Sequence, residues 1–131
     1  MIVVDASALL EVLLRVSPAG DVVEDRVFAP DQAVHVPHLI DLEVTQVLWK
    51  RALNGLLTIP RCLRALEDLA NLQLFRHPHD FLLSRVWELR DNISAYDAVY
   101  VALAEFLNAP LLTRDRRLAN APGHYARVDL I

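Results

Sequence analysis

The chain has 131 residues and a mass of 14.8 kDa, enough for one domain with its own hydrophobic core. Its net charge of −4 argues against binding nucleic acid through a broad basic surface, but it is compatible with a nuclease whose pocket is acidic. Hydrophobic residues make up 54% of the chain and the mean hydropathy is +0.28. We therefore expect surplus apolar surface that ends in an interface with a second copy or with another protein.

Neither a membrane span nor a disulfide is expected. The apolar start of the chain lacks a basic segment and is interrupted by Asp5 and Glu11, so it does not resemble a signal peptide. No charge-free apolar run approaches the roughly 18 residues that a membrane span needs. Cys62 is the only cysteine, which fits a reducing compartment. We expect a soluble, cytoplasmic protein with no membrane partner.

The first half of the chain alternates short apolar runs with longer helical patterns. Residues 1–4 are continuously apolar and β-branched, which is typical of a buried strand in a parallel sheet. Residues 33–36 predict a second strand, ended by Pro37. The apolar spacing predicts helices at residues 6–15, in a short segment ending near residue 28, at 39–53, and from about 58 to 69.

The second half continues the alternation. Residues 72–76, 111–113 and 126–130 predict strands. Helical patterns cover residues 81–90, 94–107 and 116–120. Strands that alternate with helices, without repeats or linkers, predict an α/β/α sandwich around a mostly parallel sheet, with residues 1–131 as a single domain.

Four acidic residues stand at the margins of these apolar segments. Asp5 ends the first strand, and Asp115 lies two residues beyond Thr113 at the end of another. Asp97 lies in the first turn of the long helix, and Glu43 lies near the start of its own helix. Ligands of open α/β sheets bind beyond the carboxyl ends of the strands. If the helix starts face that edge, the four side chains converge, and their mutual repulsion requires a cation.

The donor types favour a hard divalent metal. Four carboxylates without a cysteine or histidine set suit Mg²⁺ or Mn²⁺ better than zinc. A metal held by acids in an open groove is typical of enzymes that cut phosphodiester bonds. The five histidines lack metal-site spacing and are interpreted as surface or loop residues: His35, His38, His77, His79 and His124. No Gly-rich phosphate loop is present.

Each acid also has a purely structural interpretation. Ser94 and Asp97 form the Ser-x-x-Asp pattern of a capping box, and an acid in the first turn gains about 0.3–1 kcal/mol from the helix dipole. Asp5 and Asp115 could each cap the helix that follows. Glu43 could be a solvated acid on a helix surface. Taken singly, Asp97 and Glu43 are better explained in these ways, and only the shared placement favours a pocket.

Other polar residues could support such a pocket. Ser7 could hydrogen-bond a ligand carboxylate or water, or cap the first helix, and Thr113 is a further candidate. Asn92 could lie at the rim or simply in a turn. Five basic residues could contact RNA phosphates or form a solvated charged edge: Arg114, Arg116, Arg117, Lys50 and Arg51.

Taken together, these residues resemble the PIN domain and, within it, the VapC-type toxins of type II toxin–antitoxin pairs. The matching segments run in order over nearly the whole chain: Ile-Val-Val-Asp-Ala-Ser-Ala-Leu at 2–9, Pro37 with Glu-Val at 43–44 and Val-Leu at 47–48, Ser-Ala-Tyr-Asp-Ala at 94–98 with Tyr-Val-Ala-Leu-Ala at 100–104, and Leu-Leu-Thr-Arg-Asp-Arg-Arg-Leu at 111–118.

The resemblance implies an endoribonuclease that depends on Mg²⁺ or Mn²⁺. It would hydrolyse RNA by metal-activated water and leave 5′-phosphate and 3′-hydroxyl ends. Asp5 and Asp97 would be metal ligands, and Asp115 would contact the metal directly or through water. Glu43 would serve a second metal or position the attacking water.

The same resemblance implies partners. The substrate would be a structured RNA such as tRNA or ribosomal RNA, the protein would be a homodimer, and a cognate antitoxin would block the acidic groove. The main alternative is a catalytically silent PIN domain that binds RNA or a partner. A phosphatase with an aspartyl nucleophile is disfavoured because Ser7 stands where a second Asp is usual.

Overall fold

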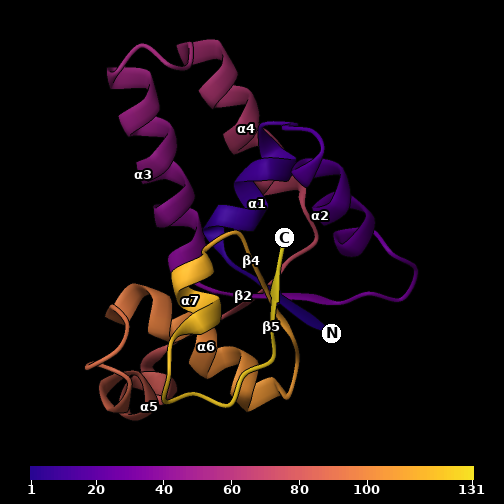
Figure 1. Cartoon of the computed structure of the whole chain (residues 1–131). Coiled ribbons are helices and arrows are strands. Elements are labelled where there is room, and N and C mark those ends of the chain that lie inside the picture. The colour runs from indigo at the N-terminus through magenta and orange to yellow at the C-terminus, as the bar shows by residue number, and fades with distance from the viewer.

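The computed structural model describes residues 1–131 and contains one five-stranded sheet between two layers of helices (Figure 1). The strand order is β3-β2-β1-β4-β5, and every neighbouring pair is parallel. The strands are β1 (Ile2–Val4), β2 (Val34–Pro37), β3 (Phe75–His77), β4 (Leu111–Thr113) and β5 (Val128–Leu130). The predicted α/β/α sandwich is therefore confirmed, with a sheet that is entirely parallel.

Helices cover both faces of this sheet. They are α1 (Ala6–Leu13), α2 (Ala19–Val27), α3 (Leu39–Leu53), α4 (Ile59–Asn71), the 3₁₀ turn η1 (Asp80–Leu82), α5 (Leu83–Glu88), α6 (Ala95–Leu107) and α7 (Arg116–Asn120). Helices α1 to α4 pack with one another on one side, and α3 and α4 form a hairpin that projects from the body (Figure 1). Helices α5 and α6 pack together on the other side. No helix has the length and apolar character that a membrane crossing requires.

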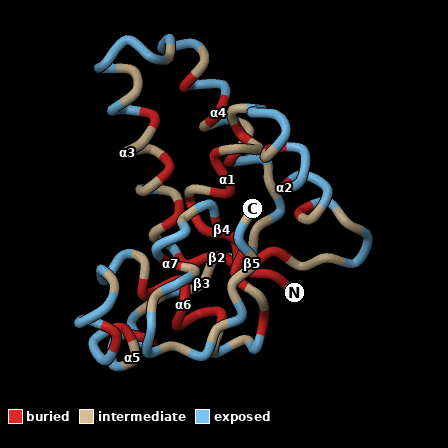
Figure 2. The backbone as a smooth tube through the Cα atoms, viewed as in Figure 1, coloured by how far each residue is buried: buried red, intermediate tan, exposed pale blue.

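The central strands are buried because helices shield them from both sides. Every residue of β1, β2 and β4 is buried, which agrees with the continuously apolar sequence of β1 (Figure 2). The buried hydrophobic residues form one cluster of 32. A change in the position of β1 or β4 would therefore disturb the whole core, so the ends of these strands are firmly placed.

The strand order reverses beside β1. The chain passes from β1 to β2 and β3 on one side, and then returns to β4 on the other side of β1. Such a reversal leaves a crevice at the carboxyl ends of the two strands, which is where open α/β sheets bind ligands. Asp5 directly follows β1, and Arg114 directly follows β4.

Several predicted boundaries shift. The strand predicted at residues 72–76 begins later, at Phe75, and ends at His77, because α4 extends to Asn71. Pro37 was expected to follow the second strand, but it is the last residue of β2, where the missing backbone N–H costs little. The helix expected at residues 81–90 begins as a 3₁₀ turn and ends at Glu88.

The interpretation of all five histidines as surface or loop residues is wrong for two of them. His35 lies inside β2 with 9% of its surface exposed, and His77 is the last residue of β3. Their rings meet, with His35 Nδ1 2.8 Å from His77 Nε2, and His35 also stacks on Phe75. Register between two short strands creates this contact, and spacing along the sequence does not reveal it.

Candidate active site

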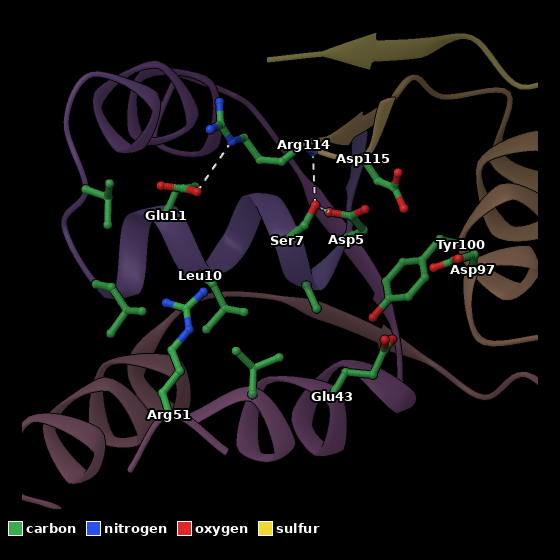
Figure 3. A pocket seen from close by; sticks show the side chains of 14 residues that line it. Asp5, Ser7, Leu10, Glu11, Glu43, Arg51, Asp97, Tyr100, Arg114 and Asp115 are labelled. Atoms are coloured by element: carbon green, nitrogen blue, oxygen red, sulfur yellow. Dashed lines mark hydrogen bonds and ion pairs between the residues drawn. The ribbon is translucent and has the colours of Figure 1, made fainter. Parts of the chain in front are cut away.

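A groove of about 320 Å³ opens beyond the carboxyl ends of β1 and β4, with walls from α1, α3 and α6 (Figure 3). All four predicted acids line it: Asp5, Glu43, Asp97 and Asp115. They come from four separate segments of the chain, so the fold supplies the convergence that the sequence only suggested.

Asp5 is the most firmly held of the four acids. Its carboxylate caps α1, since Oδ1 accepts from the backbone N of Ala8 at 2.9 Å and from Ser7 Oγ at 2.6 Å. The hydroxyl of Thr113 donates to Oδ2. Burial raises the pKa of Asp5, and these three hydrogen bonds oppose the rise. The repulsion of Asp97 raises the pKa further.

Ser7 and Thr113 also join the loop after β4 to α1. Ser7 Oγ accepts from the backbone N of Arg114 at 2.9 Å, and Thr113 Oγ1 accepts from the backbone N of Asp115 at 2.9 Å. Two of the three predicted supporting residues, Ser7 and Thr113, thus lie beside Asp5, although Thr113 is fully buried and does not line the groove. Their hydroxyls fix the loop that carries Asp115 relative to Asp5.

Asp97 enters the groove from the first turn of α6. The helix is capped by Ser94, whose Oγ accepts from the backbone N of Asp97 at 3.2 Å, so the Asp97 carboxylate is not the cap. Burial raises the pKa of Asp97, and the hydroxyl of Ser94 opposes this. The charge of Asp115 raises the pKa further, and the charge of Arg117 opposes it.

Glu43 faces the other acids from α3. Burial raises its pKa, the hydroxyl of Tyr100 opposes the rise, and the charges of Asp97 and Asp5 add to it. Its Oε1 atom is buried and has no hydrogen-bond partner. Figure 3 shows the Tyr100 hydroxyl pointing from α6 toward this carboxylate.

Asp115 differs from the other three acids. It caps α7 by accepting from the backbone N of Arg117 at 2.9 Å, and the Arg117 guanidinium lies 3.4 Å from Oδ2. Burial acts to raise the pKa of Asp115, but the hydrogen bonds and charge of Arg117 outweigh it and hold the pKa below its usual value. Asp115 is therefore the acid that most readily stays charged without a metal.

Only part of the predicted basic set reaches the groove. Arg114 and Arg51 line it, and Arg114 pairs with Glu11 at 3.4 Å (Figure 3). The other three predicted cations, Lys50, Arg116 and Arg117, do not line it. Asn92 also lies outside, in the turn between α5 and α6, close to Gly123.

The donor set fits a hydrated Mg²⁺ or Mn²⁺. The candidate metal ligands are carboxylates, and three of them have raised pKa values. The Oε1 atom of Glu43 accepts no hydrogen bond. No three acidic, histidine or cysteine side chains are close enough to hold a metal by themselves. Mg²⁺ commonly uses one or two carboxylates and fills its shell with waters and substrate phosphate, so it does not require three protein ligands.

Two polar groove residues, Glu11 and Tyr100, are absent from the predicted site. Tyr100 stands three residues after Asp97 inside an apolar helix, where it reads as a core residue. The i,i+3 spacing places both side chains on one face of α6, and this signal could have identified Tyr100. For Glu11, the helical spacing from Ser7 is a comparable signal.

Comparison with known proteins agrees with this geometry. The PIN domain family model matches residues 2–123. Ribonuclease VapC9 of Mycobacterium tuberculosis is 43% identical over 120 residues, which cover 92% of this chain and 90% of that protein. The chain belongs to the PIN-domain family. The resemblance to the VapC group of PIN domains is therefore confirmed.

Solved structures place the fold in the same group. VapC20 of M. tuberculosis, described as a sarcin–ricin loop cleaving toxin, superposes on this PIN domain with a TM-score of 0.72 over 95% of this chain and 97% of that one, at 14% identity. VapBC2 of Rickettsia felis, bound to a promoter DNA fragment, superposes with a TM-score of 0.72 over 99% of this chain and 98% of that one, also at 14% identity. At such identities the likeness establishes the shared fold.

Proposed function

We propose that this PIN domain is a metal-dependent endoribonuclease and the toxin of a toxin–antitoxin pair. The observation that supports this best is the meeting of Asp5, Glu43, Asp97 and Asp115 in one open groove at the reversal point of the sheet. The relatives named VapC ribonuclease point to RNA as the substrate. If carboxylates fill only part of the coordination shell of the cation, RNA phosphate can fill the rest.

The proposed roles follow from how each acid is held. Asp5 and Asp97 hold Mg²⁺ or Mn²⁺, Asp115 contacts it directly or through water, and Glu43 positions the attacking water or serves a second ion. When bound, the metal polarises the scissile phosphate and lowers the pKa of water. Three hydrogen bonds fix Asp5, so its carboxylate needs no reorganisation when the cation arrives.

Two basic residues are placed to bind the substrate backbone. Arg51 and Arg114 line the groove, where their guanidinium groups can contact RNA phosphates beside the scissile one. Lys50, Arg116 and Arg117 lie outside it and would extend the contact along the RNA. Ser7 and Thr113 would support the site by fixing Asp5 and the loop that carries Asp115.

We also propose the protein's partners and setting. The similarity to a toxin–antitoxin complex from Klebsiella pneumoniae supports a cognate antitoxin, and the similarity to VapC20, a sarcin–ricin loop cleaving toxin, supports a tRNA or ribosomal RNA substrate. A homodimer is what the resemblance to VapC toxins implies. Exposed aromatic residues on two separate helices supply apolar surface for these contacts, since Trp49 on α3 is 60% exposed and Trp87 on α5 is 68% exposed. The single core supports one domain at residues 1–131. A cytoplasmic location would fit the lone cysteine, Cys62.

A cleavage assay with purified protein tests this function. Wild-type protein with Mn²⁺ should cut a structured RNA into products with 5′-phosphate ends, and a chelator should stop the reaction. Asp5→Asn keeps a good N-cap residue but removes the charge, so it should fold and lose the activity. Glu88→Gln removes an exposed acid on α5 and serves as the matched control.

The silent binding module is the outcome to exclude. Binding of RNA by wild-type protein without any metal-dependent cleavage would favour that alternative. Equal cleavage by wild type and Asp5→Asn would show that the cutting comes from another nuclease.

A further inference from the structure

Two buried polar atoms in the groove face each other without a hydrogen-bond partner. They are the hydroxyl oxygen of Tyr100 and Oε1 of Glu43. Tyr100 is only 1% exposed, and no other residue hydrogen-bonds to its hydroxyl. Buried polar atoms are nearly always paired in folded proteins, so two unpaired atoms in one groove call for an explanation.

The position of Tyr100 on α6 brings its hydroxyl to the opposite wall of the groove. Tyr100 lies three residues after Asp97, so both side chains leave the same face of the helix. Figure 3 shows the ring crossing from α6 toward α3, with its hydroxyl directed at Glu43. Tyr100 thus reaches from one wall of the groove toward the other, and each of these walls carries one acid.

Glu43 needs a hydrogen-bond partner more than the other acids do. Asp5 is held by Ser7, Thr113 and the backbone of α1, and Asp115 is held by Arg117. The carboxylates of Glu43 and Asp97 accept no hydrogen bond, but only Glu43 has a buried oxygen without a partner, and its longer side chain has more rotamer freedom to lose.

The chemistry of the pair fits donation from the hydroxyl to the carboxylate. Burial and the charge of Glu43 raise the pKa of Tyr100, so the hydroxyl keeps its proton at all relevant pH values. The hydroxyl in turn counteracts the rise in the pKa of Glu43. Because the two groups face each other, a hydrogen bond between them would satisfy both unpaired atoms.

We propose that Tyr100 is a positioning residue, whose hydroxyl holds one carboxylate oxygen of Glu43 and leaves the other for the cation or a water. This inference rests on the proposed nuclease function. It makes Tyr100 part of the groove's machinery through Glu43 alone, without contact to the RNA.

Mn²⁺ binding without RNA tests the proposal. Calorimetric titration of Mn²⁺ into wild type, Tyr100→Phe, Glu43→Gln and the double variant forms a double-mutant cycle. Loss of an outer-shell partner typically weakens metal affinity 10- to 100-fold, so we expect Tyr100→Phe to bind Mn²⁺ about tenfold more weakly. In the Glu43→Gln background the same change should cause no further loss. Tyr96→Phe removes an exposed hydroxyl from the same helix and should have no effect.

Other outcomes separate this proposal from the proposed function. Unchanged Mn²⁺ affinity in Tyr100→Phe, or an equal loss in the presence and absence of the Glu43 carboxylate, would overturn the positioning role. The expected Mn²⁺ pattern in a protein that cuts no RNA would retain the positioning role and reject the nuclease. In cleavage assays, Tyr100→Phe should lower kcat and leave KM for RNA within about twofold, because the hydroxyl makes no contact with substrate.

A second measurement applies if Tyr100→Phe does not fold. Fluorotyrosine incorporated into the otherwise unchanged chain reports each of its three tyrosines by ¹⁹F NMR. The resonance of Tyr100 should move between wild type and Glu43→Gln, whereas that of the exposed Tyr125 should not. A Tyr100 resonance that ignores the Glu43 change would contradict the proposal.

Discussion

Capping a helix and lining the groove are compatible roles for one carboxylate here. Asp5 and Asp115 both cap the helices that follow them, and both line the groove. A carboxylate has about four lone-pair sites, so hydrogen bonds to backbone and hydroxyl groups leave capacity for a cation. The helix-capping interpretation and the pocket interpretation are therefore compatible at these two positions. At Asp97 they separate, because Ser94 supplies the cap.

Asp97→Asn should keep the fold and lose catalysis. The cap of α6 depends on Ser94, and burial already disfavours the charged form of Asp97, so we expect a thermal midpoint no lower than that of wild type. Loss of one ligand from the cation site should reduce cleavage more than about 100-fold. Thermal melts and cleavage rates of the same preparations measure both.

Ser94→Ala is the matched control for that variant. It removes the cap and should cost about 1 kcal/mol of stability, while cleavage by the folded protein persists. If Asp97→Asn instead unfolds the protein, the carboxylate has a capping or structural role that the hydrogen bonds do not reveal.

The sequence could identify the four acids but not the groups that hold them. Asp5 and Asp115 follow apolar strands, which is a local signal. The contact between Thr113 and Asp5 joins residues 108 apart in the chain and depends on two strands becoming neighbours. Tyr100 was not predicted as a groove residue, because a tyrosine in an apolar helix is most simply explained as a core residue.

Helix α6 presents Asp97 and Tyr100 to the groove, and a charged cluster at its far end holds it. Arg85 on α5 donates to both carboxylate oxygens of Glu105 on α6, at 2.8 and 3.0 Å. Glu105 also accepts from the backbone N of Tyr125 at 2.7 Å, and Arg85 donates to the carbonyl of Gly123. The cluster therefore ties α5, α6 and the segment before β5 together, and it supports the helix that presents Asp97.

Glu105→Gln should destabilise the protein by about 1–3 kcal/mol at pH 7, because it leaves a partly buried guanidinium without its charged partner. Burial acts to raise the pKa of Glu105, but Arg85 and the backbone N of Tyr125 outweigh it and lower the pKa below 4.5. The stability from this carboxylate is thus present above pH 4.5 and is lost as the pH falls through the lowered folded-state pKa.

Urea unfolding of wild type and Glu105→Gln between pH 7 and pH 3 measures this contribution. The difference in unfolding free energy should be largest near neutrality and should shrink at acidic pH. Glu88→Gln, which removes an exposed partner of the same arginine, should change stability by less than about 1 kcal/mol. A difference for Glu105→Gln that grows toward acidic pH would contradict the assignment.

For the whole molecule, the layers could be predicted more readily than the contacts between strands. Alternating strand and helix patterns predicted the sandwich, and continuously apolar strands predicted burial on both faces. The sequence could not predict the start of β3 or the contact between His35 and His77, because both depend on the register of strands that contribute only three or four residues each. The topology completed the site, since the reversal between β1 and β4 brings the four acids to one edge.

The central claim is that these acids make the protein an endoribonuclease toxin. Mapping RNA 5′ ends in cells after induced expression tests it most directly, with wild type compared with Asp97→Asn at equal protein levels. The account predicts growth arrest with one discrete class of new 5′-phosphate ends in wild-type cells, and neither effect with Asp97→Asn. Growth arrest without new RNA ends, or the same ends with Asp97→Asn, would contradict it.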